Sequence, residues 1–239
     1  MRILEGQGII KNFGGLTALA SVDFHIDRGE ILGLIGPNGA GKTTLFNLIS
    51  GSLVPTSGTI KFKGENITGL KPHRICKKGI ARTFQMVKLF GNMTVLENIL
   101  LGGLFGPSNG SPESHTKREC LALLEFVGLS EMKESLAKDL TIINQKRLEV
   151  ARALATKPEL LMLDEFMAGL NPTEVVLAIG LIKKIYELGM TIFMIEHVMK
   201  VIMDVSDRIV VLHHGEKIAE GTPEEIAADQ MVIDVYLGT

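Results

Sequence analysis

A run of glycines followed by a lysine and a threonine has the residue types needed to hold phosphate groups. It fits the phosphate-loop pattern G-x-x-x-x-G-K-[ST]. The glycines allow the backbone to curl so that several N–H groups point at a β-phosphate. Lys42 neutralises charge on the β- and γ-phosphates, and the Thr43 hydroxyl is a ligand for Mg²⁺. The sequence therefore predicts a nucleotide site that consists of Gly36, Pro37, Asn38, Gly39, Ala40, Gly41, Lys42, Thr43 and Thr44.

The segments on either side of this loop are those that the pattern requires. Residues 30–35 are almost wholly apolar and predict a strand that is buried on both faces. The residues after the loop predict a helix that ends at Gly51, with its positive N-terminal end facing the phosphates. A Gly-rich turn with a chance lysine is the structural alternative. The order strand, loop, helix favours the nucleotide site.

Two carboxylates, Asp164 and Glu165, close a second apolar stretch, ELLMLDE at 159–165. Buried charges need partners, so this arrangement is an odd one to build for stability alone. Beside a phosphate loop it has a use. Asp164 would hold Mg²⁺ through water, and Glu165 would polarise the attacking water as general base. Two acids at a solvated strand end are the structural alternative.

His197 ends a third apolar stretch, TIFMIEH at 191–197. We expect this strand to lie next to the one that ends in Asp164, so that both C-terminal ends face the same phosphates. His197 would then contact the γ-phosphate and orient the water. A histidine at a strand end is otherwise an ordinary surface residue.

Composition limits the class of protein. The chain has 239 residues, of which 46% are hydrophobic and 22% charged, a balance that is typical of a folded globular protein. Its net charge of −2 argues against nucleic acid as the main partner. Cys76 and Cys120 show no metal-binding or CxxC spacing, so we expect free thiols. We see neither a signal peptide nor an apolar run near the ~18 residues that span a bilayer, so a membrane role would need a partner.

Apolar periodicity and turn residues give the expected elements. They predict strands over residues 3–10, 20–26, 30–35, 57–64, 159–165, 191–197 and 208–215. They predict helices over 92–104, 116–128, 144–156 and 173–188, then a short helix and a C-terminal helix. The basic segment 71–83 is either a solvated helix face or a functional basic patch, and 106–114 is a Gly/Pro/Ser-rich loop. We therefore expect an α/β core of strand–helix units with a mainly helical insert at about 87–157.

The segments GPNGAGKTT, ARTFQ, LMLDE, AGLNP and MIEH occur in the order and approximate spacing of ABC-transporter nucleotide-binding subunits. The resemblance covers about residues 3–238. It implies one nucleotide-binding domain over 1–239, with a P-loop NTPase (RecA-like) core, an N-terminal antiparallel β subdomain and a helical subdomain insert. The cofactors that it implies are ATP and Mg²⁺.

The resemblance also assigns roles to single residues. It makes Gln85 the Q-loop glutamine near Mg²⁺, and Asp164 the Walker B aspartate. Glu165 resembles the catalytic glutamate, and His197 the switch histidine. Phe13 takes the place of the aromatic residue that stacks on adenine, and residues 168–171, AGLN, take the place of the D-loop.

More local segments, among them NFGGLTAL, KLFGNMTVLENIL, RLEVARAL and the ending VYLG, resemble the ATPases of branched-chain amino-acid importers. Such subunits dimerise at the cytoplasmic face of the membrane and dock on permease subunits fed by a solute-binding protein. The ATPase of lipopolysaccharide export and those of amide and urea importers share many of these features. The resemblance therefore leaves open the solute, its direction of transport, and whether the dimer contains one kind of subunit or two.

One segment departs from the family pattern. The signature LSGGQ, which meets the ATP of the opposite subunit, falls on residues 140–144, and here it reads Leu140, Thr141, Ile142, Ile143 and Asn144. Thr141 keeps a hydroxyl. The two isoleucines add bulk where a backbone must approach phosphate, and their β-branching resists positive φ. Phe166 also replaces the usual proline after the glutamate.

This departure leaves more than one function open. Two explanations compete. Either the signature is degenerate and only the ATP site of the partner is slow, or the chain has been altered or has diverged and the whole dimer is impaired. In the second case the chain would be an ATP-responsive dimerising or regulatory module with little turnover. A soluble ABC ATPase of translation or DNA repair is a third reading, but it usually needs two cassettes or a long coiled-coil insert.

Overall fold

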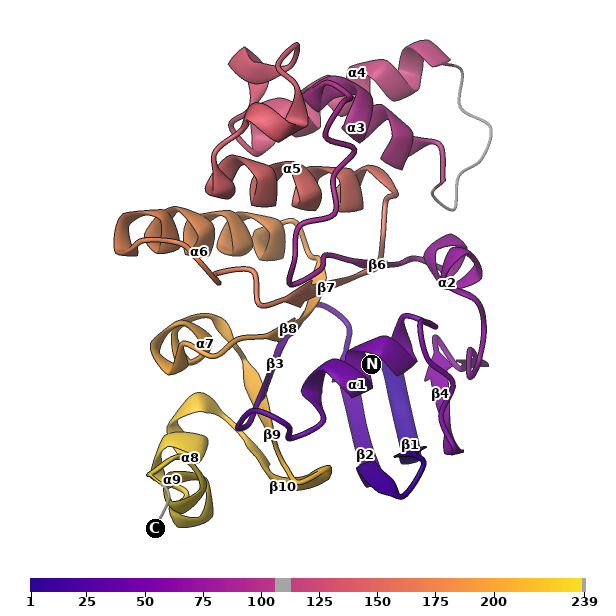
Figure 1. The fold of residues 1–239 in the computed structure, drawn as a ribbon, viewed down its shortest axis with the longest axis vertical. Coiled ribbons are helices and arrows are strands. Elements are labelled where there is room, and N and C mark those ends of the chain that lie inside the picture. Colours follow the sequence, from indigo (N-terminus) through magenta and orange to yellow (C-terminus); the bar gives the residue numbers. More distant parts are fainter. Residues whose placement is uncertain (106–112, 238–239) are drawn as a thin grey trace. The chain divides into compact units, whose positions relative to one another are not determined.

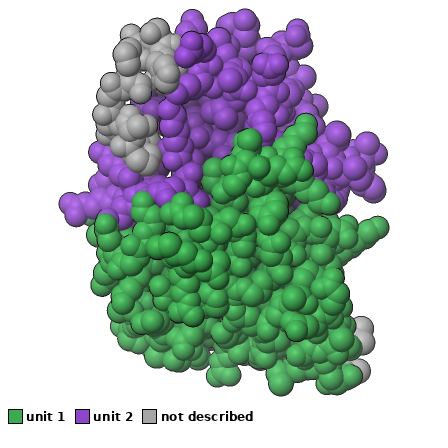
Figure 2. All heavy atoms as spheres, turned by 180° about the vertical axis from the view of Figure 1, so that it is seen from behind, with its two compact units in different colours: residues 1–72, 182–239 green, residues 73–181 purple. Residues whose placement is uncertain are grey.

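A computed structural model describes residues 1–105 and 113–237 of the chain. It divides into two compact units, which Figure 2 shows in different colours. Unit 1 contains residues 1–72 and 182–239, and unit 2 contains residues 73–181.

The first sheet of unit 1 is antiparallel, with the strand order β2-β1-β4-β5 (Figure 1). Its strands are β1 (Arg2–Phe13), β2 (Leu16–Asp27), β4 (Ser57–Phe62) and β5 (Glu65–Asn66). The first two strands form a long hairpin in which Phe13 pairs with Leu16. The predicted N-terminal antiparallel sheet is thus present. Its strands β1 and β2 are longer than the sequence pattern indicated, and β4 is shorter.

The other strands of unit 1 bring two predicted site segments to one edge. Their order is β10-β9-β3-β8, and they are β3 (Ile31–Ile35), β8 (Thr191–Ile195), β9 (Arg208–His213) and β10 (Glu216–Gly221). Strands β8 and β9 run parallel to β3, one on each side. Parallel strands end at the same edge of a sheet, so the segments after β3 and after β8 start side by side.

Aromatic packing joins the layers of unit 1. The ring of Phe193 on β8 lies 4.7 Å from that of Phe46 and 6.0 Å from that of Phe24, centroid to centroid. Phe46 belongs to helix α1 and Phe24 to β2, so one buried cluster joins both sheets to the helix after the phosphate loop. The helices of this unit are α1 (Lys42–Ile49), α7 (Met199–Val205), α8 (Pro223–Ala228) and α9 (Gln230–Leu237).

Unit 2 is mainly helical and also contains a pair of parallel strands, β6 (Ile80–Arg82) and β7 (Leu160–Asp164). Helices α3 (Val95–Gly103), α4 (Glu113–Phe126) and α5 (Ile142–Ala155) pack on one another. A Cβ at Gly102 would lie 2.4 Å from the Arg152 carbonyl oxygen, so α3 and α5 touch backbone to backbone at this point. The remaining elements are α2 (Pro72–Lys78), η1 (Ser130–Met132), η2 (Ala137–Asp139) and α6 (Pro172–Glu187), which continues into unit 1.

The prediction for the C-terminal region was wrong in part, because a strand precedes the helical end. His214 and Gly215 both have positive φ, +48 and +82, as in a tight two-residue hairpin turn. The chain therefore folds back as β10 instead of continuing the strand to residue 215. Thr222 then starts α8 with a capping box to Glu225, and α9 follows as a separate helix.

The basic segment 71–83 also differs from expectation. Its first part is the helix α2, but residues 80–82 form β6, and the side chain of Arg82 is only 7% exposed. A solvated helix face therefore describes only part of the segment. The predicted loop at 106–114 lies outside the described residues except for Glu113 and Ser114, which begin α4. The predicted insert bounds of 87–157 stay a prediction.

Among the described residues, no helix has both the length and the apolar character that crossing a membrane requires.

Candidate functional site

The phosphate loop of unit 1 joins the end of β3 to the start of α1. Its backbone needs glycine at two positions, Gly36 with φ +148 and Gly41 with φ +101. A Cβ at Gly36 would lie 2.1 Å from the Leu212 carbonyl oxygen, and one at Gly41 would lie 2.6 Å from the Ala18 carbonyl oxygen. Backbone from neighbouring strands therefore holds the loop in its curled form.

Lys42 begins α1 and lies within the loop, where it is 5% exposed. Its ammonium donates to the carbonyl oxygens of Gly36, at 2.6 Å, and Pro37, at 2.9 Å. The first turn of α1 contains no acidic residue. A buried cation and an open helix N-terminus both favour an anion, so this end of α1 suits a phosphate group.

The C-terminal helix also reaches this loop. Tyr236 on α9 lies near the first residue of the loop, so that the Gly36 N–H lowers the pKa of its phenol. Burial raises the pKa of this phenol above its ordinary value, while the Gly36 N–H acts in the opposite direction. The ending VYLG therefore places one residue, Tyr236, near the first residue of the phosphate loop.

Two further predicted residues of unit 1 stand at strand ends. Phe13 ends β1 with a ring that is 45% exposed, and the ammonium of Lys11 lies 5.0 Å from its centroid. An exposed ring of this kind is a suitable surface for a stacked base. His197 is exposed and follows β8, the parallel neighbour of β3. His197 therefore follows a strand that ends at the same sheet edge as the phosphate loop. Its expected position near Asp164, which belongs to unit 2, stays a prediction.

In unit 2, Asp164 ends β7 with a side chain that is 3% exposed. Its Oδ2 accepts from the guanidinium of Arg82 at 2.6 Å. Its Oδ1 is buried and has no hydrogen-bond partner within the described part of the chain. A buried carboxylate oxygen without a partner fits a ligand of a divalent cation, since Mg²⁺ prefers oxygen ligands.

Two residues hold Glu165, one at its side chain and one at its backbone. The side-chain amide of Gln85 donates to its Oε2 at 2.7 Å, and the ammonium of Lys146 donates to its carbonyl oxygen at 3.3 Å. The backbone of Glu165 has φ +48, a rare and strained conformation for a residue other than glycine. Phe166, which follows, is buried, and the Lys146 ammonium lies 5.9 Å from the centroid of its ring. Strain of this kind is typical of functional positions.

The loop around Gln85 is fixed by helix α5. A carboxylate oxygen of Glu149 accepts from the N–H of Lys88 at 3.2 Å, and the nearby N–H of Phe84 lowers the pKa of the same carboxyl. The guanidinium of Arg152 donates to the carbonyl oxygen of Lys88. These contacts bracket Gln85 on both sides, so the helix that begins at residue 142 also positions the glutamine that contacts Glu165.

The N-terminus of α5 holds residues 141–144. Thr141 is the N-cap, and its side chain makes no capping hydrogen bond within the described chain. Ile142 is 55% exposed, whereas Ile143 is 7% exposed. The amide of Asn144 points away toward the Met132 sulfur, at 3.4 Å. The free N–H groups of the first turn therefore remain, beneath an exposed isoleucine.

The backbone conformation of residues 142 and 143 bears on the expected effect of β-branching. Ile142 and Ile143 are helical and are not among the residues with positive φ. The positive φ of this neighbourhood belongs to Glu165 instead. Side-chain bulk is therefore the property that separates these isoleucines from glycine.

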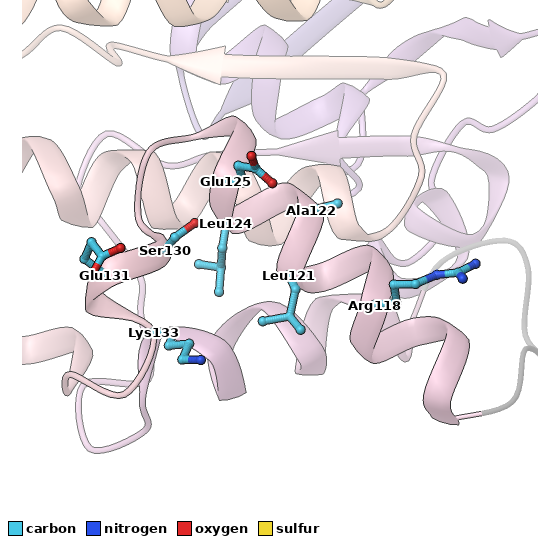
Figure 3. Close-up of a pocket in the computed structure, with 8 residues that line it drawn as sticks. All are labelled: Arg118, Leu121, Ala122, Leu124, Glu125, Ser130, Glu131 and Lys133. Atoms are coloured by element: carbon cyan, nitrogen blue, oxygen red, sulfur yellow. The ribbon is translucent and has the colours of Figure 1, made fainter.

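A surface hollow of ≈ 540 Å³ lies elsewhere in unit 2, between α4 and the segment after it (Figure 3). It is lined by Arg118, Leu121, Ala122, Leu124, Glu125, Ser130, Glu131 and Lys133. None of these residues is a predicted site residue, so the hollow is separate from the candidate nucleotide site.

Comparison with known proteins decides the family. The model of the family described as ABC transporter matches residues 19–168 of the chain. The chain belongs to the ABC transporter family. A second model, described as branched-chain amino acid ATP-binding cassette transporter, matches residues 216–239. The high-affinity branched-chain amino acid transport ATP-binding protein BraF of Pseudomonas aeruginosa is 43% identical, over 99% of this chain and 98% of its own length.

Solved ABC cassettes have the same fold. The ADP conformation of MJ1267, an ATP-binding cassette of an ABC transporter, is similar with a TM-score of 0.90 and 31% identity, over all of both chains. A dimeric, post-hydrolysis form of the cassette MJ0796 with bound ADP and Pi matches with a TM-score of 0.82 and 26% identity, over 92% of this chain and 99% of that one. The predicted α/β fold class, with its antiparallel sheet and helices, is confirmed.

Several residues of this ABC cassette were missed by reasoning on the sequence. Arg82 was seen only within a basic run and the ARTFQ segment, and no role was assigned to it. Lys146 was seen only within a helix, and Glu149 and Arg152 only within that helix and the RLEVARAL segment. The last three recur at intervals of three residues, so they lie along one side of α5. Charged residues at that spacing on an otherwise buried helix were the available signal.

Glu149 gives the structure a pH-dependent contribution. It is 2% exposed, and burial raises its pKa, against the N–H donors of Lys88 and Phe84. A carboxyl whose pKa is raised by folding binds more protons in the folded state, so stability falls as pH rises from its ordinary value of 4.5 through the raised one.

We expect Glu149→Gln to lose less stability than the wild type between pH 4.5 and pH 7, since the amide is not titrated. Thermal unfolding of both proteins across this range measures the difference. Glu134→Gln removes an exposed carboxylate of the same unit and serves as the control. Identical pH profiles for Glu149→Gln and the wild type would contradict the role of burial.

Proposed function

We propose that this chain is the ATP-hydrolysing subunit of a branched-chain amino-acid importer. The observation that supports it best is the joint match of residues 19–168 to the ABC transporter family and of residues 216–239 to the branched-chain amino acid cassette model. The full-length similarity to BraF, whose name states branched-chain amino acid transport, supports the same solute class. The chain would work at the cytoplasmic face of the membrane, on permease subunits fed by a solute-binding protein.

ATP would lie on the phosphate loop with its base on Phe13. Lys42 and the N-terminus of α1 would neutralise the phosphates, while Thr43, Gln85 and Asp164 would hold Mg²⁺. The bound Mg²⁺ would withdraw charge from the phosphates during transfer. The unpartnered Oδ1 of Asp164 supports this assignment, because it is an oxygen ligand already stripped of water.

Glu165 and His197 would act on the attacking water. Glu165 accepts its proton as general base, and the Gln85 amide on its Oε2 keeps the carboxylate oriented. The strained backbone at Glu165 and the Lys146 contact support a position that is fixed before substrate arrives. His197 would contact the γ-phosphate from the end of β8.

A second cassette would complete the site. The similarity to the dimeric MJ0796 cassette supports dimerisation. In such a dimer, Thr141, Ile142, Ile143 and Asn144 would face the ATP of the partner. The open N-terminus of α5 would still favour the γ-phosphate, but the exposed Ile142 would obstruct close approach. This feature favours slow hydrolysis at the ATP site of the partner. In a homodimer both sites would meet Ile142, so the dimer would respond to ATP with little turnover.

Removal of the loop lysine tests ATP binding. We expect Lys42→Ala to bind Mg-ATP more weakly by about 1.5–3 kcal/mol, the usual value for hydrogen bonds to charged groups. Titration calorimetry on the chain alone measures this. Lys77→Ala, which removes an exposed lysine of α2, should leave the affinity unchanged. Equal affinities for wild type and Lys42→Ala would refute the assignment.

Replacement of the general base separates binding from hydrolysis. We expect Glu165→Gln to keep ATP affinity, to trap an ATP-bound dimer, and to slow turnover by about 10²-fold or more. The amide oxygen can still accept from Gln85, so the fold should persist. Glu174→Gln, an equal change in the capping box of α6, should retain turnover. If an active assembly hydrolyses ATP equally fast with Glu165→Gln, another group is the base.

Glycines at the signature test the asymmetric arrangement. We expect Ile142→Gly with Ile143→Gly to raise homodimer ATPase activity by at least about tenfold. Without the bulk of Ile142 the N–H groups of the first turn could approach the phosphate, and one such oxyanion donor typically supplies 10²–10³ in rate. Each glycine weakens a helix by about 1 kcal/mol, and the buried Ile143 also leaves a cavity, so thermal stability should fall.

Leu121→Gly in α4 is the control for the loss of helix propensity and should not raise activity. In a heterodimer with a normal partner, Glu165→Gln in this chain should abolish nearly all turnover, whereas the equivalent change in the partner should leave much of it. Equal losses from the two changes, together with no gain from the glycines in a folded dimer, would rule out the asymmetry.

A further inference from the structure

Arg82 and Asp164 form an ion pair that is almost entirely removed from water. The guanidinium nitrogen and Oδ2 are 2.6 Å apart, and the two side chains are 7% and 3% exposed. They end the parallel strands β6 and β7, in which Arg82 pairs with Met162. The adjacent strands therefore fix the two side chains at one edge.

The contact is one-sided. A guanidinium can bind both oxygens of a carboxylate through its two-pronged donor set. Here the Oδ1 of Asp164 stays without a hydrogen-bond partner among residues 1–105 and 113–237, although it is buried. The N–H of Asp164 is also occupied, since it donates to the Thr83 hydroxyl at 3.4 Å. Arg82 thus fixes one oxygen and leaves the other.

The ring of Phe84 supports the position of Arg82. The guanidinium carbon lies 5.2 Å from the Phe84 centroid, within the range of a cation–π contact. Phe84 precedes Gln85, whose amide contacts Glu165. The arginine is therefore anchored by the same loop that orients the general base.

We propose that Arg82 is a positioning residue that holds Asp164 so that Oδ1 alone is left for the Mg²⁺ of Mg-ATP, and whose charge keeps free Mg²⁺ from binding there without nucleotide. This inference rests on the proposed function, in which Asp164 is a magnesium ligand. The cation then arrives together with the phosphates, which supply the further negative charge.

Electrostatics gives the physical reason. Asp164 without Arg82 would be a buried, unpaired negative charge, which is strongly destabilising. Any small cation that reached it would then be bound and would stabilise the fold by mass action. With Arg82 in place the charge is already balanced, so a free divalent cation gains little.

The test measures thermal unfolding without nucleotide, in EDTA and in 10 mM MgCl₂. The proteins are wild type, Arg82→Met, Arg82→Lys, Arg82→Met with Asp164→Asn, and Arg74→Met as a control for an exposed arginine. We expect Arg82→Met to lower the Tm in EDTA and Mg²⁺ to restore about 2–4 °C. Wild type, Arg82→Lys, Arg74→Met and the double variant should show no magnesium effect.

The same variants, together with Asp164→Asn alone, are then titrated with ATP in EDTA and in Mg²⁺, to separate this inference from the proposed function. We expect Asp164→Asn to reduce the gain in ATP affinity that Mg²⁺ gives, and Arg82→Lys to retain most of it. If Asp164→Asn changes nothing, the magnesium assignment itself fails.

A different result overturns the role of Arg82 alone. It is a loss of Tm in Arg82→Met that is the same with and without Mg²⁺, while Asp164→Asn does alter the ATP titration. Arg82 would then be a structural counter-charge. If Arg82→Met does not fold, Arg82→Lys supplies the test, because its ammonium keeps the charge that balances Asp164. A magnesium-dependent Tm in that variant would contradict the inference.

Discussion

A carboxylate that is taken out of water needs a cation or hydrogen-bond donors around it, and Asp164 and Glu165 impose this condition on unit 2. Both stand at the end of β7 and are almost fully buried. Arg82 and Gln85 come from the segment around β6, and Lys146 comes from α5. The need to surround two adjacent charges thus determines where β6, the loop after it and helix α5 lie.

In unit 1 the main constraint is a different one, because the backbone of the phosphate loop lies very close to the backbone of neighbouring strands. The phosphate loop fits against the carbonyl oxygens of Leu212 and Ala18 only because its glycines lack a Cβ. Strand β9 and strand β2 therefore shape the loop, and the cluster of Phe24, Phe46 and Phe193 packs β2 and β8 against α1. Rigidity at the loop comes from the sheet, so Lys42 and the helix N-terminus are in place before a phosphate binds.

Local patterns predicted most of this. The phosphate loop, the buried strand before Asp164 and the helices of unit 2 follow from residue types within a few positions of each other. Partners far apart in sequence could not be predicted: Arg82 is 82 positions from Asp164, and Glu149 is 61 from Lys88. Strand β10 was missed because its turn depends on positive φ at His214, which the sequence did not reveal. The backbone strain at Glu165 likewise arises from tertiary contacts.

That strain has a consequence for protein engineering. A residue other than glycine with φ near +48 costs on the order of 1 kcal/mol or more, which the surrounding contacts must offset. Glycine at position 165 would relax the backbone, so a search for heat-resistant variants that scores stability alone would favour it. Such a search would thereby remove the carboxylate on which turnover depends. Position 165 is therefore one that a stabilisation campaign should hold fixed.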